Sequence, residues 1–355
     1  MMPSSTRSGA ELPAPSTTAV APAGRRRALS PLLLGLVVAI VVTLGCVALS
    51  LAVGTRAIAL ADVWTALVAP TGTFDDTVVA SRIPRTLLAV LVGSALAVSG
   101  VVMQGVTRNP LGDPGLLGVN VGAAAAIVTA AWFFGTGSAA ASVWVALPGA
   151  FVTVVIVYAL GSGRRAASPV RLVLAGAVVS AVIAAYIQAL SLSRPDVFDS
   201  YRYWVVGSLA GREPAVVGEI LPFILVGLAF AFLIAPALNT LALGDDTATA
   251  LGASTGRTRV LGAVATTLLC AASTAAVGPI GFVGLAVPHI VRSFTGSDHR
   301  WVMLYSAILG PALVLLADVI ARVIVSPAEL MVGVVTAFIG APVLLYAVRR
   351  GRGFA

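Results

Sequence analysis

A succession of long apolar runs limits this chain more than any other feature of its sequence. A helix that crosses a bilayer needs about 20 apolar residues. Because 59% of the residues are hydrophobic and only 10% are charged, lipid must cover much of the surface. The sequence therefore predicts an all-α polytopic membrane protein with about ten transmembrane helices. The candidate runs are 31–54, 86–106, 115–134, 143–162, 170–190, 215–236, 260–277, 280–294, 301–320 and 331–348.

The arginines orient the predicted bundle. There is no lysine, and with the N-terminus inside, the cytoplasmic segments carry 15 of the 22 arginines against 7 outside. This bias is typical of an even number of spans with both termini in the cytoplasm. We expect residues 1–30 to form a disordered cytoplasmic tail, 31–350 a single transmembrane domain and 351–355 a short cytoplasmic tail. A processed leader is the alternative for the first segment, although no clear cleavage site follows it.

Composition also excludes several classes of function. The net charge of +8 lies in loops between apolar runs, which fits membrane topology better than a nucleic-acid face. Cys46 and Cys270 lie within apolar runs, which predicts buried thiols without a disulfide framework. His289 and His299 are the only histidines, so no cluster could hold zinc or iron. We predict no metal site and no bound cofactor.

The polar interruption "LNTLALGDDTATALGASTGRTR" (238–259) separates two apolar runs. Its Ala, Leu and Thr content favours short helices, and Gly244 and Gly252 would separate them. Such a pair of helices on the cytoplasmic face is what a transporter needs to bind a soluble motor. An ordinary interfacial loop is the alternative.

A second unusual segment, "VGPIGFVGLAVPHIVR" (277–292), places glycine and proline inside an apolar run. Discontinuous helices of this kind are typical of gates and pathways in transporters, although both residues are common in membrane helices. The run at 280–294 is also short and contains Pro288, which indicates a broken or tilted helix.

Three of the seven arginines predicted to face outward lie close to the ends of apolar runs, on the side where membrane proteins usually carry few. Arg82 and Arg85 precede an apolar run, and Arg322 follows Asp318 by four residues near the end of another. Asp318 and Arg322 would share a helix face. An ion pair of that kind on a surface adds only about 0.3–0.5 kcal/mol to the stability of the protein. Interfacial anchoring is one reading of such arginines.

Five motifs in order make the chain resemble the FecCD/BtuC-type permeases, which import ferric siderophores, haem or cobalamin through ATP-binding-cassette systems. The resemblance covers about residues 30–350 and implies ten helices per subunit, working as a dimer. The motifs are "RIPRTLLAVLVGSALAVSGVVMQGVTRNPLGDPGLLGVNVGA", "LNTLALGDDTATALG", "GPIGFVGLAVPHIVR", "DHR" and "LLADVIARVIVSPAELMVGVVTAFIGAPVLL".

The resemblance implies roles for residues at both faces. It places Arg82, Arg85 and Arg322 outside, where exposed guanidiniums would receive glutamates of a substrate-binding protein. It makes 238–259 the element that couples to a separate ATPase. The coupling residues would be Leu243, Gly244, Asp245, Leu251 and Gly252, and the gate or pathway linker would include Gly278, Pro279 and Gly281.

The resemblance implies an importer that is not itself an enzyme. The chain has no G-x-x-x-x-G-K-[ST] phosphate loop and no lysine, so ATP and magnesium would bind the partner ATPase. A secondary transporter would carry ionisable residues at mid-membrane. A prenyltransferase would need more than the pairs Asp75–Asp76 and Asp245–Asp246. Ferric siderophore is the expected substrate, with cobalamin or haem as alternatives, and the second permease subunit is a copy or a paralogue.

Overall fold

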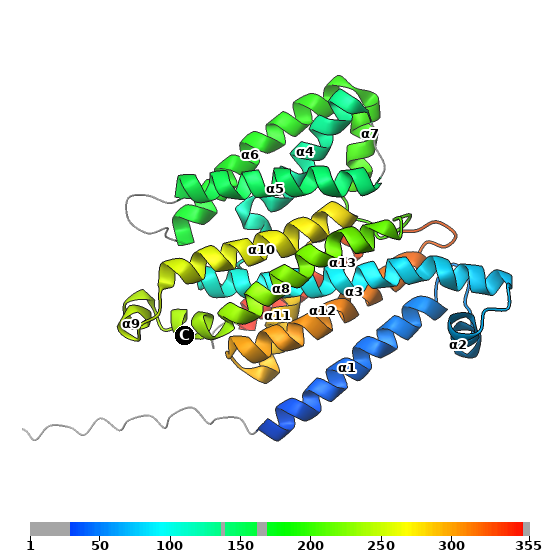
Figure 1. Cartoon of the computed structure of the whole chain (residues 1–355), viewed down its shortest axis with the longest axis horizontal. Coiled ribbons are helices and arrows are strands. Elements are labelled where there is room, and N and C mark those ends of the chain that lie inside the picture. Colours follow the sequence, from blue (N-terminus) through cyan, green and yellow to red (C-terminus); the bar gives the residue numbers. More distant parts are fainter. Residues whose placement is uncertain (1–28, 136–138, 162–168, 351–355) are drawn as a thin grey trace, which may run out of the picture.

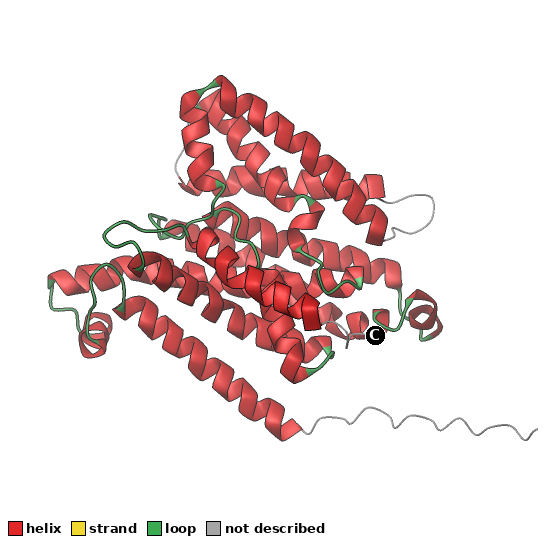
Figure 2. Cartoon of the chain, turned by 180° about the vertical axis from the view of Figure 1, so that it is seen from behind, coloured by secondary structure: helices red, strands yellow, loops and turns green. Residues whose placement is uncertain are grey.

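A computed structural model gives the structure of the chain and describes residues 29–135, 139–161 and 169–350. All regular elements in these ranges are helical, as Figure 2 shows. This confirms the predicted all-α class. Nearly all of the expected N-terminal tail and the whole of the expected C-terminal tail lie outside the described residues.

Each of the ten predicted runs contains one helix, and three further helical segments and one 3-10 turn lie between them. Figure 1 shows their arrangement. The helices are α1 Leu29–Ala52, α2 Leu60–Val68, α3 Phe74–Thr107, η1 Pro114–Leu117, α4 Val119–Phe134, α5 Ala139–Gly161, α6 Pro169–Ser193, α7 Pro195–Trp204, α8 Ala215–Leu241, α9 Asp245–Ala250, α10 Thr255–Val277, α11 Val283–Thr295, α12 His299–Val323 and α13 Val332–Arg350.

Within the described residues, seven helices are long and apolar enough to cross a membrane. They are α1, α3, α5, α6, α8, α10 and α12. Two more, α4 and the part of α13 at Val332–Leu345, are apolar but shorter. The 13 residues of α11 extend only about 20 Å, less than the ~30 Å hydrocarbon core. The number of helices that cross the membrane therefore stays a prediction.

The central helix, α3, begins earlier than its apolar run indicated. We expected the span to start at residue 86, but the helix starts at Phe74 and continues for 34 residues. Thr73 and Asp76 form a capping box that fixes this start in a polar stretch, so hydropathy alone does not detect it. Arg82 and Arg85 consequently lie inside a helix rather than before one.

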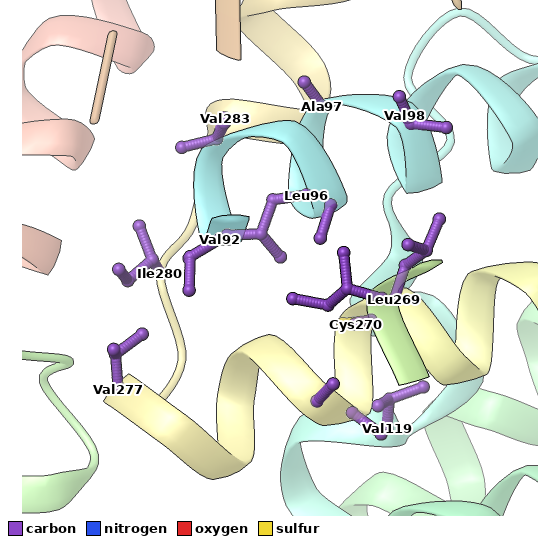
Figure 3. Close-up of a cluster of buried hydrophobic side chains, with 14 of the residues drawn as sticks. Val92, Leu96, Ala97, Val98, Val119, Leu269, Cys270, Val277, Ile280 and Val283 are labelled. Atoms are coloured by element: carbon purple, nitrogen blue, oxygen red, sulfur yellow. The ribbon is translucent and has the colours of Figure 1, made fainter. Parts of the chain in front are cut away.

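The core forms where α3 packs against α8, α10, α11 and α12. Figure 3 shows Val92 and Leu96 of α3 close to Leu269 and Cys270 of α10. Where α3 meets α11 a Cβ on Gly100 would overlap the main chain of Gly284, so only glycine permits this close approach. Small residues thus allow close backbone contact in a setting where lipid provides no hydrophobic drive between helices.

The remaining large helices form a second group. Helices α4, α5 and α6 pack on one another and meet the core mainly through α10 (Figure 1). We name the two ends of the molecule after the short helices found there. The α2 end holds α2 and the first residues of α3, and the α9 end holds α9 and the last residues of α8, as Figure 1 shows.

Candidate functional site

Arg82 lies at the α2 end and is buried against the end of a neighbouring helix. Its guanidinium donates to the carbonyl oxygen of Leu51 at 2.7 Å and to that of Arg56 at 2.6 Å. Leu51 belongs to the last turn of α1, whose carbonyl groups have no partner within the helix. A cation there satisfies one carbonyl and interacts favourably with the helix dipole. Arg82 therefore fastens the end of α1 to α3.

Arg85 is held by two carboxylates, one from the neighbouring helix α12 and one from the loop after it. Its Nε donates to both oxygens of Asp318 at 3.0–3.1 Å, and its Nη2 lies 2.9 Å from Asp318 Oδ1. Its Nη1 lies 2.8 Å from Glu329 Oε2, in the loop between α12 and α13. Only 15% of the Arg85 side chain is exposed. This side-on pairing joins α3 to α12 and to the loop that follows it.

Asp318 is shared between two arginines. Arg322 Nη2 lies 3.1 Å from Asp318 Oδ2, and Arg322 also donates to the carbonyl and hydroxyl oxygens of Ser50 at 3.0 Å. The exposed fraction is 1% for Asp318 and 2% for Arg322. We name Arg82, Arg85, Asp318, Arg322 and Glu329 the arginine cluster. With three cations and two carboxylates it carries a net charge of +1 if all are ionised.

This geometry corrects two expectations from the sequence. The guanidiniums of Arg82 and Arg322 are buried rather than exposed, because their partners come from α1 and were not visible in the local sequence. The pair of Asp318 and Arg322 is a buried pair rather than a surface pair, so the small surface value does not apply to it.

A cavity of about 510 Å³ opens beside the arginine cluster. One wall belongs to the first turns of α3 and the other to the segment before α8. Sequence reasoning missed this segment, although its arginine within "GREP" was a signal of a charged turn. The lining residues are Ala80, Ser81, Pro84, Arg85, Leu209, Gly211, Arg212, Glu213 and Pro214.

The α9 end presents apolar side chains to the surface. Leu243 is 60% exposed and Leu251 is 65% exposed, one on each side of the six-residue helix α9. Gly244 and Gly252 precede and follow this helix with φ angles of 100° and 80°. The interruption at 238–259 thus holds one short helix instead of the expected pair, because its outer residues extend α8 and α10. Both leucines are therefore accessible at the α9 end.

Asp245 fixes α9 to the bundle. Its carboxylate lies 2.9 Å from the Nη2 atom of Arg259 on α10 and 3.7 Å from the Nη2 atom of Arg108 at the end of α3. Arg259 is buried, whereas Arg108 and Asp245 are more exposed. A single carboxylate therefore connects α9 to the ends of two core helices.

The linker after α10 is packed into a crossing of backbone segments. The N–H of Ser208 donates to the carbonyl oxygen of Val277 at 2.7 Å. Gly278 has a φ angle of 77°, and a Cβ there would overlap the main chain of Trp204. Pro279 follows in the same crossing, whereas a Cβ on Gly281 would meet nothing within 4 Å. Gly278 and Pro279 are thus packed against neighbouring backbone segments, whereas Gly281 has open space at the position of a side chain.

Metal-binding chemistry finds no support among residues 29–135, 139–161 and 169–350. No group of three or more His, Cys, Asp or Glu side chains is close enough there to hold an ion. Cys46 and Cys270 are buried and unpaired with each other, as expected for thiols in apolar runs. The described geometry offers a buried cluster of charges at the α2 end and two exposed leucines beside α9.

Comparison with known proteins gives a consistent set of relatives. The family model described as the FecCD transport family matches residues 39–350. The ferric enterobactin transport system permease protein FepD of Escherichia coli is 48% identical over 305 residues, 85% of this chain and 91% of the relative. The probable siderophore transport system permease protein YfiZ of Bacillus subtilis is 37% identical over 318 residues, 89% of this chain and 96% of the relative.

A solved structure has the same architecture. It shows an inward-facing conformation of a metal-chelate type ABC transporter, with a TM-score of 0.77 and 29% sequence identity. The match covers 91% of this chain and all of the other. The helical arrangement in Figure 1 is thus one already observed in a transporter subunit.

Proposed function

Because this chain belongs to the FecCD transport family, we propose that it is the membrane permease of an ATP-binding-cassette importer for a ferric siderophore. The observation that carries the proposal is the 48% identity to a ferric enterobactin permease over 85% of this chain. The matching fold of a metal-chelate transporter supports it independently of that relative. Cobalamin or haem import is the alternative within the family.

The permease moves its substrate but supplies no chemistry to it. A siderophore brings its own ligands for iron, so the chain needs no metal cluster of its own. ATP hydrolysis belongs to a separate pair of ATPase subunits, in line with the missing phosphate loop. A second permease subunit, a copy or a paralogue, completes the pathway through the membrane.

The α9 end is the proposed binding surface for the ATPase. Leu243 and Leu251 would insert into an apolar groove of that subunit, and Gly244 and Gly252 set the turns around α9. Asp245 would carry movements of α9 to α3 and α10 through Arg108 and Arg259. This assignment puts the α9 end, and both termini, in the cytoplasm of a multi-pass inner-membrane protein with its transmembrane domain at 31–350.

The α2 end is the proposed binding surface for an extracytoplasmic substrate-binding protein. Arg82, Arg85 and Arg322 would contribute to this surface, with Arg85 the most open of the three. Arg82 and Arg322 would act mainly by holding α1, α3 and α12 in place. The linker at Gly278, Pro279 and Gly281 is the proposed moving part of the pathway, and Gly281 has open space where a side chain would lie.

Uptake in cells that lack the native gene tests the substrate. Iron-starved cells carrying the wild-type chain would receive a ⁵⁵Fe-labelled siderophore, labelled haem or labelled cobalamin, in separate experiments. We expect accumulation of the iron chelate only, with the amount of permease in the membrane measured in parallel. Rescue of cobalamin or haem uptake alone would leave the family intact and overturn the substrate. Rescue of none, at a normal membrane level, would contradict the importer itself.

A further inference from the structure

Arg212 is a further arginine beside the arginine cluster. Its Nε donates to the carbonyl oxygen of Ser208 at 3.2 Å. Among the described residues, no carboxylate lies within 4.0 Å of its guanidinium. Arg85, by contrast, is occupied by Asp318 and Glu329. Like Arg82, which binds only main-chain carbonyl oxygens, Arg212 has a neutral partner but no acid, and of these two arginines only Arg212 lines the cavity.

The surroundings make this an unfavourable position for a lone cation. Arg212 is partly buried in the segment before α8, and burial lowers the pKa of its guanidinium below the ordinary value. A desolvated charge costs free energy unless an opposite charge or several hydrogen bonds compensate it. A carboxylate that reached Arg212 would form a charge-assisted, bidentate pair.

The cavity of about 510 Å³ gives such a carboxylate a way in. Arg212 lies in one wall and Arg85 in the other, on α3. Asp318 and Glu329 already pair with Arg85, so Arg212 is the arginine of the lining that has no carboxylate partner. Arg85, in the wall formed by α3, has carboxylates as both of its ion-pair partners. A carboxylate is therefore a suitable partner for the other arginine of the cavity as well.

We propose that Arg212 receives an acidic side chain of the substrate-binding protein, inserted into the cavity between α3 and the segment 209–214. The inference rests on the proposed function, and it names the arginine that remains open for a partner. The cavity lies where α3 and α8 begin, and these helices pack against each other. A side chain that enters the cavity from the surface and leaves again suits this position better than a solute that must pass between packed helices.

Binding measurements on the intact transporter test the proposal. The permease with its ATPase subunits is placed in lipid nanodiscs. The probe is a purified, substrate-loaded binding protein, chosen because cells that lack its gene fail to take up the substrate. We expect Arg212→Glu to weaken binding by about tenfold or more and to reduce its dependence on salt. Arg212→Lys keeps the charge but cannot form the bidentate pair, so we expect a loss of affinity smaller than that of Arg212→Glu. Basal ATPase activity, which should not change, shows that each variant is assembled.

The matched control is Arg202→Glu on α7. Arg202 is also predicted to face outward, but it is more exposed than Arg212 and forms an ion pair with Asp199. We expect less than a twofold change in binding for this variant. Equal losses of binding affinity in the two variants would mean that the effect comes from the overall surface charge, and this would overturn the proposal. If Arg212→Glu bound the binding protein normally but slowed uptake, the cavity would act on the substrate instead, and the proposal would also be overturned. Failure of the wild type to transport any iron chelate would instead contradict the proposed function.

Discussion

The arginine cluster at the α2 end and the two leucines that flank α9 use their side chains in opposite ways. At the α2 end, the charges of Arg82, Asp318 and Arg322 are buried and joined to one another or to main-chain carbonyl groups. At the α9 end, Leu243 and Leu251 are exposed although they are large and apolar. A soluble surface would normally show the reverse pattern, with charges exposed and leucines covered.

The difference indicates where each end can bind a partner. Charges that already pair within the chain hold the helices of the bundle together. A second protein must bind the charged groups that are still accessible, chiefly Arg212 and the open side of Arg85. Exposed leucines have no internal partner to lose, so the α9 end can bind a groove directly. Substitutions at the α2 end should therefore affect stability first, and those at the α9 end should affect coupling first.

The largest effect is expected for Asp318→Asn in the arginine cluster. Removing this carboxylate leaves Arg85 with only Glu329 and Arg322 without an acid, both in a buried setting. Breaking a buried pair from one side typically costs about 3–5 kcal/mol. Thermal unfolding of the purified transporter would measure the loss. The control is Asp62→Asn on exposed α2, and equal midpoints for the two variants would contradict a stabilising cluster.

The double substitution Leu243→Asp and Leu251→Asp examines the α9 end. Both side chains are exposed, so the free energy of unfolding should change by no more than about 0.5 kcal/mol. Transport should fall at least tenfold, about 1.4 kcal/mol, because two charges would enter an apolar groove. Uptake of labelled iron chelate and co-purification of the ATPase give the two readouts. Normal uptake with normal ATPase binding would mean that this surface is not the contact.

A smaller effect is expected for Asp245→Asn, with the neighbouring Asp246→Asn as its control. Asp245 bridges Arg108 and Arg259, whereas Asp246 is exposed and makes no ion pair in the described part of the chain. Because Asp245 is itself partly exposed, the loss of stability should be about 1 kcal/mol. The ATPase should then hydrolyse ATP with less transport per turnover. Identical ratios of transport to hydrolysis in the two variants would argue against a relay through Asp245.

The smallest effect is expected for Glu329→Gln. Arg85 keeps Asp318, and the side chain of Glu329 is partly exposed, so the free energy of unfolding should fall by less than about 1 kcal/mol. Thermal unfolding alongside Asp318→Asn gives the ratio of the two effects. A loss as large as that of Asp318→Asn would show that the outer carboxylate, not the buried one, holds the cluster together.

Hydropathy predicted the helices well because each apolar run is a local property of the sequence. The runs at 31–54 and 301–320, for example, correspond closely to α1 and α12. The start of α3 was missed because the capping box of Thr73 and Asp76 extends that helix through polar residues. Helix ends depend on side-chain hydrogen bonds that an average over an apolar window does not contain.

The charged end was harder to predict than the apolar end. The turns around α9 were visible from Gly244 and Gly252, since each is a local signal. The burial of Arg322 depends on Ser50, which lies 272 residues earlier in the chain. The sequence contains both residues but not their proximity. Arg212 is inconspicuous for the same reason, because its importance comes from a cavity shared with α3.

Reconstitution into proteoliposomes tests the central claim most directly. Vesicles would contain the permease with or without its ATPase subunits, with ATP inside, and the loaded binding protein with a ⁵⁵Fe siderophore would be added outside. Labelled iron should accumulate only when the ATPase, ATP and binding protein are all present. Accumulation without the ATPase, driven by an ion gradient across the vesicle, would contradict it and identify a secondary transporter.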